Sequence, residues 1–468
     1  MLFDSPVYVV FLALVVAFYW RLGWKKQNVF LLAASYFFYG WWDWRFLALM
    51  LTSTLVDYTF ALKIGGSPNQ RLRRTLLVLS LVMNFGFLGF FKYCNFFAES
   101  FTHVMAFIGV GHISPFFLKI ILPPGISFYT FQEVAYIVDV YRRKQEPSRS
   151  LVDYALFISL FPHLIAGPIQ RPSHLLPQVQ RPREFDSTKF FGGLMLILSG
   201  LFRKCVIADN CALLANAAFA GQLGHNCFSS FIGVYAFAWQ IYGDFSGYSD
   251  LARGSAQLLG FHFMVNFRQP YFAASLQDFW RRWHISLSTW LRDYVYIPLG
   301  GNRLGELRTY VNLLTTMLLG GLWHGANWTF ILWGAVHGGW LAIERFFDSL
   351  ILKRQHRVNH GWVGRFATLA VVGMAWIIFR APSVSQALTM LGEFVNFEWH
   401  PEYAVALIYL AIVSFAALAM DWRLEYANEE YLFETARPGK ALAAALGMCA
   451  VITVFGALET SAFIYFQF

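Results

Sequence analysis

The chain has 468 residues, of which 57% are hydrophobic and only 13% are Asp, Glu, Lys or Arg. Soluble domains carry about twice that share of charged residues, so the composition excludes a protein whose whole surface faces water and indicates a polytopic membrane protein. The net charge of +9 comes from short basic groups between apolar runs, which is typical of topology signals and not of a nucleic-acid-binding arm.

Apolar segments of about 20 residues, the length that crosses a bilayer, recur along the chain. The first segment follows Asp4 instead of basic residues and precedes no small-residue cleavage site, so we expect a retained helix and no signal peptide. The predicted spans are 7–21, 28–42, 46–64, 75–91, 118–141, 190–210, 228–248, 308–323, 327–347, 363–380, 403–421 and 440–462. The sequence predicts an all-α membrane protein with about 11–13 transmembrane or re-entrant helices, in a single domain over residues 1–468.

Two stretches do not fit a simple span. Residues 151–175 contain an apolar run that is broken at Pro162 and again at Gly167-Pro168. A broken helix at membrane depth needs surrounding protein to satisfy its backbone, so we expect a re-entrant element. Residues 270–298 mix tryptophans with charged side chains, which predicts short amphipathic helices at the membrane surface or over a cavity.

Basic groups also predict the orientation of the chain. Lys25-Lys26, the arginines at 71–74 and the basic residues at 142–144 should all face the cytoplasm by the positive-inside rule. An even number of crossings must separate neighbouring groups. We therefore interpret residues 95–112 as a helix that does not cross the membrane.

The first candidate for chemistry is a histidine between two apolar segments. The run Gly320-Gly321-Leu322-Trp323-His324-Gly325-Ala326-Asn327 places one imidazole on a glycine-rich bend, and an ionisable side chain at membrane depth indicates function. Histidine titrates near neutral pH, as a general base for a hydroxyl requires, and we expect the glycines to leave room for a substrate beside the ring. The alternative is a core histidine bonded to a carbonyl. His337 would face the opposite side of a continuous helix.

The second candidate is a polar run interleaved with tryptophans. Its charged, imidazole and hydroxyl side chains include Asp278, Arg281, Arg282, His284, Ser288, Arg292 and Asp293. At helical spacing Asp278 and Arg282 form an ion pair, and residues 284, 288 and 292 share one face that would line a polar passage or hold an anionic donor. Binding of lipid head groups by an interfacial helix is the alternative role of each arginine.

The third candidate is a set of hydrogen-bonding side chains around two carboxylates near the end of a predicted span. The set consists of Tyr242, Asp244, Ser246, Asp250, Asn266 and Gln269. Carboxylates at membrane depth need partners, and we expect Arg281 and Arg282 to supply them. A structural ion-pair network is favoured over direct catalysis at these positions.

Several familiar signatures are missing from the sequence. It contains no G-x-x-x-x-G-K-[ST], G-x-S-x-G or H-E-x-x-H motif, so ATP use and soluble-hydrolase chemistry have no support. The five cysteines form no C-x-x-C pair. We therefore expect no bound metal and no disulfide framework.

Four runs together resemble the membrane-bound O-acyltransferase family, and within it the bacterial alginate O-acetyltransferase branch. In chain order they are Leu122-Pro123-Pro124-Gly125-Ile126-Ser127-Phe128, Tyr242-Gly243-Asp244-Phe245-Ser246-Gly247-Tyr248-Ser249-Asp250, Asp278-Phe279-Trp280-Arg281-Arg282-Trp283-His284-Ile285-Ser286-Leu287-Ser288 and Gly320-Gly321-Leu322-Trp323-His324-Gly325-Ala326. The resemblance extends from the N-terminus to about residue 347, with a motif-rich catalytic core over about 118–347.

The resemblance implies helices around a central tunnel that is open to both membrane faces, with His324 at its narrow middle and His284 at the family's second, polar histidine position. It implies transfer of an acyl group from a thioester, acetyl-CoA, with His324 as general base or as transient acyl carrier. Trp323, Asn327 or backbone N–H groups would stabilise the oxyanion. The polar residues of the second and third candidates would line the tunnel.

The acceptor that the resemblance implies lies outside the inner membrane of a bacterium. Relatives acetylate alginate, cellulose or peptidoglycan, and a more distant one moves D-alanine toward teichoic acid. A polymer does not thread a narrow tunnel, so an extracytoplasmic SGNH-type acetyltransferase would pass the acetyl group to the polysaccharide. Two departures from the family pattern leave the polymer open: Gly243 replaces a bulky aromatic residue, and Arg253 replaces a small apolar one.

A transporter of lipids or glycans is the rival class of function, because it would share the many helices and the buried charges. Transporters often show paired broken helices in two similar halves, and the sequence contains no such repeat. The sequence therefore favours an enzyme and leaves its oligomeric state open.

Overall fold

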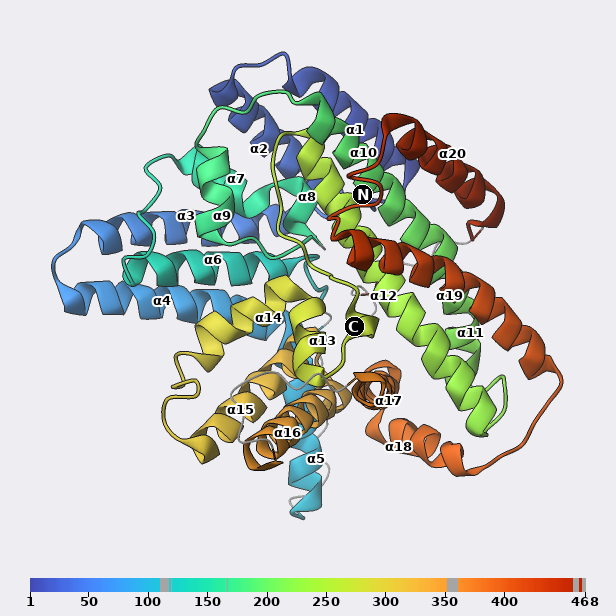
Figure 1. Ribbon diagram of the computed structural model, residues 1–468. Coiled ribbons are helices and arrows are strands. Elements are labelled where there is room, and N and C mark those ends of the chain that lie inside the picture. The colour runs from blue at the N-terminus through green and yellow to red at the C-terminus, as the bar shows by residue number, and fades with distance from the viewer. Residues whose placement is uncertain (110–117, 119, 166, 352–360, 458–462, 465–468) are drawn as a thin grey trace. The chain divides into compact units, whose positions relative to one another are not determined.

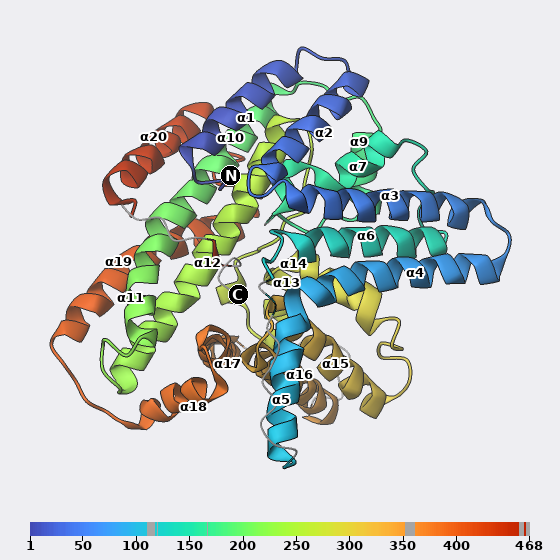
Figure 2. The same ribbon diagram turned by 180° about the vertical axis from the view of Figure 1, so that it is seen from behind.

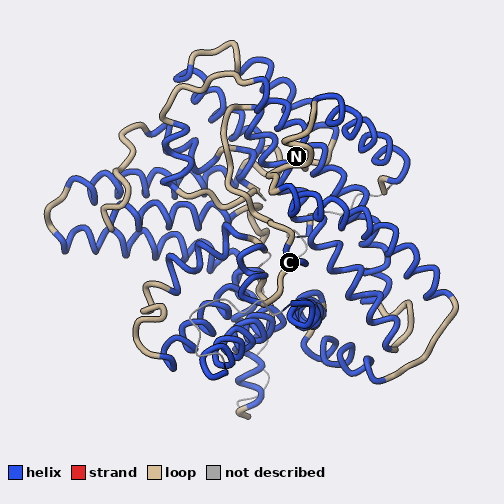
Figure 3. The backbone as a smooth tube through the Cα atoms, viewed as in Figure 1, coloured by secondary structure: helices blue, strands red, loops and turns tan. Residues whose placement is uncertain are grey.

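The computed structural model describes the whole chain except residues 110–117, 119, 166, 352–360, 458–462 and 465–468. Every regular element in the described part is helical, and no strand is present there (Figure 3). The predicted all-α class is confirmed.

The α-helices of the described ranges are α1 Pro6–Tyr19, α2 Trp24–Gly40, α3 Arg45–Gly66, α4 Gln70–Leu88, α5 Cys94–Phe107, α6 Ile126–Tyr141, α7 Leu151–Ser159, α8 Phe161–Leu164, α9 Pro172–Val179, α10 Ser187–Leu201, α11 Asp209–Phe219, α12 Cys227–Leu258, α13 Leu276–Arg282, α14 Ile285–Leu291, α15 Glu306–His324, α16 Trp328–Ile351, α17 Gly361–Arg380, α18 Val384–Gly392, α19 Glu402–Ala427 and α20 Pro438–Phe455 (Figure 1). Three π-helical turns continue α-helices: η1 Gly89–Tyr93, η2 Phe202–Ala208 and η4 Arg292–Tyr296. Two short 3-10 turns, η3 Pro270–Phe272 and η5 Glu393–Val395, complete the set.

Among the described residues, six helical stretches are long and apolar enough to cross a membrane. They are Arg45–Gly66, Gln70–Phe107, Ser187–Phe219, Gly361–Arg380, Glu402–Ala427 and Pro438–Phe455. Several crossings of the membrane are therefore available. The helix of the predicted span 118–141 begins only at Ile126.

The segment 95–112, which we interpreted as a helix that does not cross the membrane, continues directly from α4 up to Phe107, and its residues 110–112 lie outside the described ranges. That it does not cross the membrane stays a prediction. The turn η1 carries the chain from α4 into α5 without an interruption, and Figure 2 shows α5 leaving α4 at a steep angle. A π-helical turn inserts an extra residue into the helical ladder, which bends the helix axis. The sequence pattern of apolar residues does not reveal such a turn.

The contacts divide the chain into two compact units, and a single domain over 1–468 stays a prediction. Unit 1 comprises Met1–Gly193 and Ser255–Phe263, and unit 2 comprises Leu194–Gly254 and Met264–Phe468. Within unit 1, α3, α4 and α6 lie side by side (Figure 1).

Unit 1 contains the predicted break in the helix over residues 151–175. Three short helices, α7, α8 and α9, stand where one span would have been continuous. Phe161 begins α8 and is fully buried, and its backbone N–H donates to Ser35 Oγ at 3.1 Å. A side chain of α2 therefore provides a hydrogen-bond acceptor for the interrupted backbone, as a broken helix at membrane depth requires.

One end of unit 1 brings the three predicted basic loops together. Asn28, in the first turn of α2, donates to Asp153 at 2.8 Å. Gln70, at the start of α4, donates to the Tyr141 hydroxyl at 2.9 Å, and the Tyr58 hydroxyl donates to the Arg149 carbonyl at 2.9 Å. When the chain crosses the membrane twice between successive basic groups, these groups lie on the same side. Their position at one end of unit 1 therefore supports the predicted orientation.

Unit 2 is held together by close approaches at glycines. A Cβ on Gly243 would lie 2.9 Å from the Arg203 carbonyl oxygen and 3.2 Å from Ala208 Cβ. In α15, a Cβ on Gly321 would collide with the Phe330 carbonyl oxygen of α16. Small residues let helix backbones approach this closely in a membrane. The absence of an aromatic side chain at 243 therefore has a packing reason.

Candidate active site

His324 is the last residue of α15 and is surrounded by aromatic side chains. Its ring is 4% exposed, and the ring centroids of Trp323, Trp333 and Phe379 lie 5.1, 5.0 and 5.3 Å from its own. These neighbours come from α15, α16 and α17, which lie together in unit 2 (Figure 1). The helices thus hold the predicted general base in an apolar environment with little access to water.

The glycines beside His324 do not leave room for a substrate, and that prediction was wrong. The space beside Gly325 is filled by the Phe330 ring, and the space beside Gly321 by the Phe330 backbone. These glycines allow α15 and α16 to pack against each other. Any substrate space at His324 must therefore lie on another side of its ring.

His284 lies at a break between α13 and α14, where two of the short helices that we predicted over residues 270–298 meet. Its backbone is left-handed, with φ of +42°, which is uncommon for a residue with a side chain. Ser288 Oγ donates to the Trp283 carbonyl at 3.1 Å, across this break. His284 is the N-cap residue of α14, and its carbonyl accepts the Ser288 N–H at 2.9 Å, so residues 284 and 288 are one helical turn apart. The polar passage that they would line stays a prediction.

The His284 ring is completely buried among polar and aromatic groups. Its Nδ1 lies 3.2 Å from Asn266 Oδ1, and its ring packs edge-on against Phe245 at 4.6 Å between centroids. Burial lowers the pKa of His284 to about 3, so the ring is neutral at physiological pH. The Nε2 atom is buried without a hydrogen-bond partner in the described residues.

Trp323 connects the two predicted catalytic histidines. Its indole centroid lies 5.7 Å from that of His284 and 5.1 Å from that of His324. The two histidines belong to the third and fourth sequence runs, and the fold gathers both on one indole. The structure therefore groups the residues that we predicted as catalytic.

His337 is also connected to this group, contrary to the prediction from a continuous helix. The helix ends at His324 and a new one begins at Trp328. The Trp333 ring lies 4.5 Å from the His337 ring and 5.0 Å from the His324 ring. His337 Nδ1 accepts from Trp280 Nε1 at 3.3 Å, which gives this histidine a structural partner.

The two arginines of the second candidate have different surroundings. The predicted pair of Asp278 with Arg282 is confirmed at 3.2 Å, and Arg282 also pairs with Glu425 at 3.0 Å. Arg281 is exposed and makes no ion pair with any described residue. Arg281 is therefore the one of the two that is available to an anionic ligand.

The prediction that Arg281 and Arg282 pair with the carboxylates of the third candidate was wrong. Lys204 binds Asp244 at 2.9 Å, and Arg253 lies 3.4 Å from Asp250. Arg203 binds Asp421 at 2.8 Å. The cations come from the turn η2 and from α12 itself.

Sequence reasoning missed Arg203 and Lys204, although a signal was present. They are two adjacent basic residues inside the predicted span 190–210. Each is almost completely buried. Charges at such a position require buried partners, and Asp209, Asp244 and Asp421 supply them. A purely structural role of this network stays a prediction.

Several of the other predicted site residues make hydrogen bonds within the protein. The Tyr242 hydroxyl donates to Asp421 at 2.8 Å, and Ser246 Oγ donates to the Tyr242 carbonyl at 2.6 Å. Asn327 donates to the Pro382 carbonyl at 3.0 Å and caps α16 by accepting from the Thr329 N–H at 3.0 Å. These contacts leave the Asn327 amide poorly placed as an oxyanion donor.

Gln269 differs from these residues because its unusual feature is its backbone conformation. It is 8% exposed and has a left-handed φ of +42°, directly before Pro270. The backbone N–H of Phe272 donates to its carbonyl at 3.1 Å. Gln269 therefore shapes the turn η3, which leads into α13.

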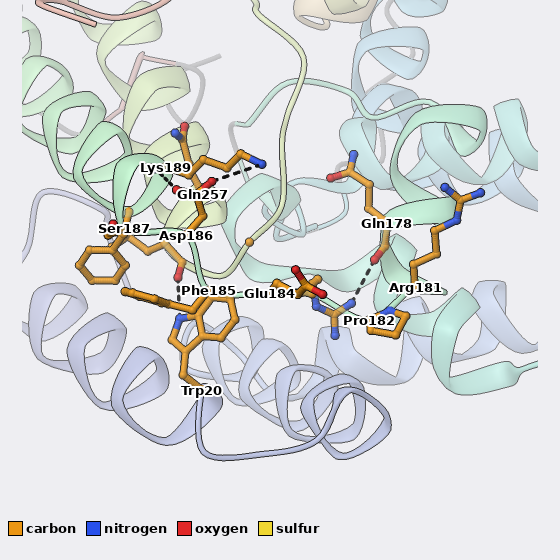
Figure 4. Close-up of a pocket in the computed structure, with 14 residues that line it drawn as sticks. Trp20, Gln178, Arg181, Pro182, Glu184, Phe185, Asp186, Ser187, Lys189 and Gln257 are labelled. Atoms are coloured by element: carbon orange, nitrogen blue, oxygen red, sulfur yellow. Dashed lines mark hydrogen bonds and ion pairs between the residues drawn. The ribbon is translucent and has the colours of Figure 1, made fainter.

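A cavity of about 650 Å³ lies in unit 1 and is not part of this site (Figure 4). Its lining carries charges of both signs, from Arg181 and Lys189 and from Glu184 and Asp186. None of the predicted site residues lines it. Among the described residues, no group of three or more His, Cys, Asp or Glu side chains is placed to hold a metal ion.

Comparison with known proteins identifies the family. A model of the membrane-bound O-acyltransferase family matches residues 36–391. A Pseudomonas putida protein named "Probable alginate O-acetylase AlgI" is 45% identical over 407 residues, which cover 85% of this chain and 81% of that protein. The peptidoglycan O-acetyltransferase of Helicobacter pylori is 37% identical over 429 residues, covering 85% and 80%. The teichoic acid D-alanyltransferase of Bacillus subtilis is 28% identical over 255 residues, covering 51% and 62%.

The family match covers well over half of the chain, and it includes all four sequence runs that carried the resemblance. The resemblance is confirmed, and with it the acyltransferase class of enzyme and a multi-pass membrane protein. The chain belongs to the membrane-bound O-acyltransferase family.

Proposed function

We propose that this protein is an O-acetyltransferase of the bacterial inner membrane that moves acetyl groups from cytoplasmic acetyl-CoA toward an extracytoplasmic polysaccharide of the alginate type. The relative named as an alginate O-acetylase shares more identity with this chain than the peptidoglycan O-acetyltransferase does. The two sequence departures no longer weigh against this substrate. Gly243 is required by packing, and Arg253 pairs with Asp250 and Glu430.

The observation that carries the proposal is the placement of His324 and His284 on one indole in a buried, aromatic part of unit 2. Acyl transfer needs a base for the acceptor hydroxyl and exclusion of the water that would hydrolyse the thioester. A buried imidazole within an aromatic surround supports both requirements.

In the proposed reaction, His324 takes the proton of the acceptor hydroxyl as its oxygen attacks the thioester carbonyl. The carbon–sulfur bond then breaks, and the proton passes from His324 to the leaving thiolate, so that no net proton is consumed. Backbone N–H groups and the Trp323 indole are the candidate donors to the oxyanion. An acetyl group carried transiently on His324 is the alternative course.

The proposed acceptor on the outer side is an SGNH-type acetyltransferase that passes the acetyl group to the polymer. The described loops form no additional folded domain, because all regular elements belong to the two helical units. The proposal assigns delivery of the acetyl group to the polysaccharide chain to this second protein.

The first prediction concerns His324. His324→Ala should lower acetyl-CoA-dependent acetyl transfer by roughly 100-fold to 10,000-fold, the range lost when a general base is removed. The measurement is release of CoA thiol by the purified protein in detergent, with and without the acceptor. His103→Ala removes an exposed histidine of α5 and should leave the rate unchanged.

The same assay separates the two roles of His324. After one turnover without acceptor, radiolabelled acetyl on the wild-type protein and not on His324→Ala would identify an acyl carrier. Near-normal acetyl transfer by a folded His324→Ala protein would reject both roles.

A further inference from the structure

The side-chain oxygen of Asn266 is the point at which three donors meet. The Ser286 backbone N–H donates to Asn266 Oδ1 at 3.2 Å, and the Ser286 hydroxyl donates to it at 2.9 Å. A backbone N–H donates and never accepts, so the atom facing it must be the oxygen of the amide. The third group at this oxygen is His284 Nδ1, at 3.2 Å.

This geometry determines which ring nitrogen of His284 carries the proton. An amide oxygen has no hydrogen to give, so a hydrogen bond between it and Nδ1 requires that Nδ1 carries the proton and donates. The Ser286 hydroxyl lies 3.5 Å from Nδ1 but gives its hydrogen to the nearer Asn266 Oδ1, at 2.9 Å. In a neutral imidazole, Nε2 is then an unprotonated acceptor. That atom is buried and has no partner in the described residues, which is costly unless a ligand supplies one.

Asn266 also holds the strained backbone at His284. Its own carbonyl accepts the Ile285 N–H at 2.9 Å, and its side chain holds the N–H of Ser286. Both contacts fix the chain directly after the left-handed residue. Strained residues persist where the surroundings over-determine them, and they cluster at functional sites.

We infer that Asn266 is a positioning residue for acyl transfer: it locks His284 in the tautomer that presents an unprotonated Nε2 as a hydrogen-bond acceptor to the substrates. The inference rests on the proposed function for its consequence in activity. It assigns His284 a different task from His324, because a neutral acceptor orients an O–H or N–H group while His324 moves the proton. Asn266 acts through His284 and not by lining the substrate path.

Three variants test the inference. Asn266→Ala removes the acceptor and should lower thioester cleavage on the order of 100-fold, since a wrong tautomer disables an imidazole in catalysis. Asn266→Asp keeps an oxygen acceptor and should retain the rate within about 10-fold. Ser249→Ala removes only the contact from Asn266 Nδ2, which is 3.2 Å long, and should retain nearly the full rate.

The deciding measurement is the ¹⁵N NMR spectrum of the full chain labelled at histidine, with the His284 signals assigned by their loss in His284→Gln. Wild type, Asn266→Asp and Ser249→Ala should show a protonated Nδ1 and an unprotonated Nε2, and Asn266→Ala should show a mixture. A protonated Nε2 in the wild type, or an unchanged tautomer in Asn266→Ala, overturns the inference. Because the spectrum does not depend on turnover, absence of acetyl transfer in every sample would reject the proposed function alone.

Discussion

Arg281 and Arg282 are neighbours in sequence whose surroundings give them different tasks. Arg282 lies between Asp278 and Glu425, whereas Arg281 is exposed with no ion-pair partner in the described residues. A guanidinium without a carboxylate partner can bind phosphate groups, such as those of CoA. Only position 281 therefore remains a candidate for contact with the donor.

Arg281→Gln should raise the KM for acetyl-CoA severalfold and leave kcat nearly unchanged, because it removes an interaction that is already made with bound substrate. Arg282→Gln is the matched variant. It should lower the free energy of unfolding by about 1 kcal/mol or less, as for other partly exposed ion pairs, with little change in KM.

Steady-state kinetics and thermal unfolding in the same detergent separate the two variants. An unchanged KM in Arg281→Gln would return this arginine to the role of binding lipid head groups. It would leave the assignment of the histidines untouched.

Residue identities predicted some of these roles and not others. The pair of Asp278 with Arg282 could be predicted because helical spacing holds over one turn. The partners of Asp244 and Asp250 could not, because they depend on how η2 packs against α12. The task of Asn266 was hidden for the same reason, since only the fold brings it to His284.

Helix α12 and the turn η2 pack closely at Gly243, one of the two positions where the sequence departs from the family pattern. Gly243 faces the backbone of Arg203 at the point where the π-helical turn displaces the chain. A side chain at this position would push apart two elements that carry buried charges. Glycine therefore fits at position 243 because of the way α12 packs against η2.

Gly243→Ala should reduce the yield of folded protein and lower its unfolding temperature, because the added Cβ meets a backbone oxygen that cannot move aside. The free energy cost should reach about 1–3 kcal/mol, as for other overpacked sites. Gly447→Ala, in α20, is the control, since no atom lies within 4 Å of its added Cβ. Size-exclusion chromatography and thermal unfolding provide the comparison, and equal stability of the two variants would contradict the packing argument.

The element scale is also where sequence patterns failed most clearly. An apolar period of 3.6 residues does not distinguish one helix from two that meet at a break. The break at His284 depends on a left-handed backbone held by Asn266, and the bend after α4 depends on a π-helical turn. The break within residues 151–175 could be predicted from its prolines, because proline removes a backbone hydrogen-bond donor.

For the whole molecule, the main open property is its orientation in the membrane. The basic loops meet at one end of unit 1, and the positive-inside rule places that end in the cytoplasm. The opposite end of α3 begins at Arg45, directly after the exposed Trp44. Exposed positions in the basic loops and Trp44 at the far end of α3 therefore provide a matched set of labelling positions.

In a variant without its native cysteines, Arg71→Cys and Lys144→Cys should react with a membrane-impermeant maleimide only after the membrane is opened. Trp44→Cys should react in intact spheroplasts. All three positions are exposed, so differences in labelling report the side of the membrane. Labelling of positions 71 and 144 in intact spheroplasts would reverse the orientation and remove the argument for transfer from the cytoplasm outward.

At this scale the sequence was most informative. Composition excluded a soluble protein, and four runs of residues were sufficient to identify the family. The division into two units was not predicted, because it depends on contacts between segments that are distant along the chain, such as Ser255–Phe263 with the first 193 residues. The apolar periodicity of a helix shows that one of its faces is buried, but it does not show which other helix covers that face.

The ion pair of Arg203 with Asp421 has a consequence for the synthesis of the chain. Its partners are 218 residues apart, so at 5–20 residues per second the ribosome needs roughly 10–45 s to reach Asp421 after Arg203 has been made. During that time the apolar stretch Ser187–Phe219 carries Arg203 without Asp421, its nearer carboxylate, although Asp250, which lies 3.9 Å away in the folded protein, has already been made. A chain that stops before α19 therefore leaves Arg203 with only the longer of its two ion pairs, the one with Asp250.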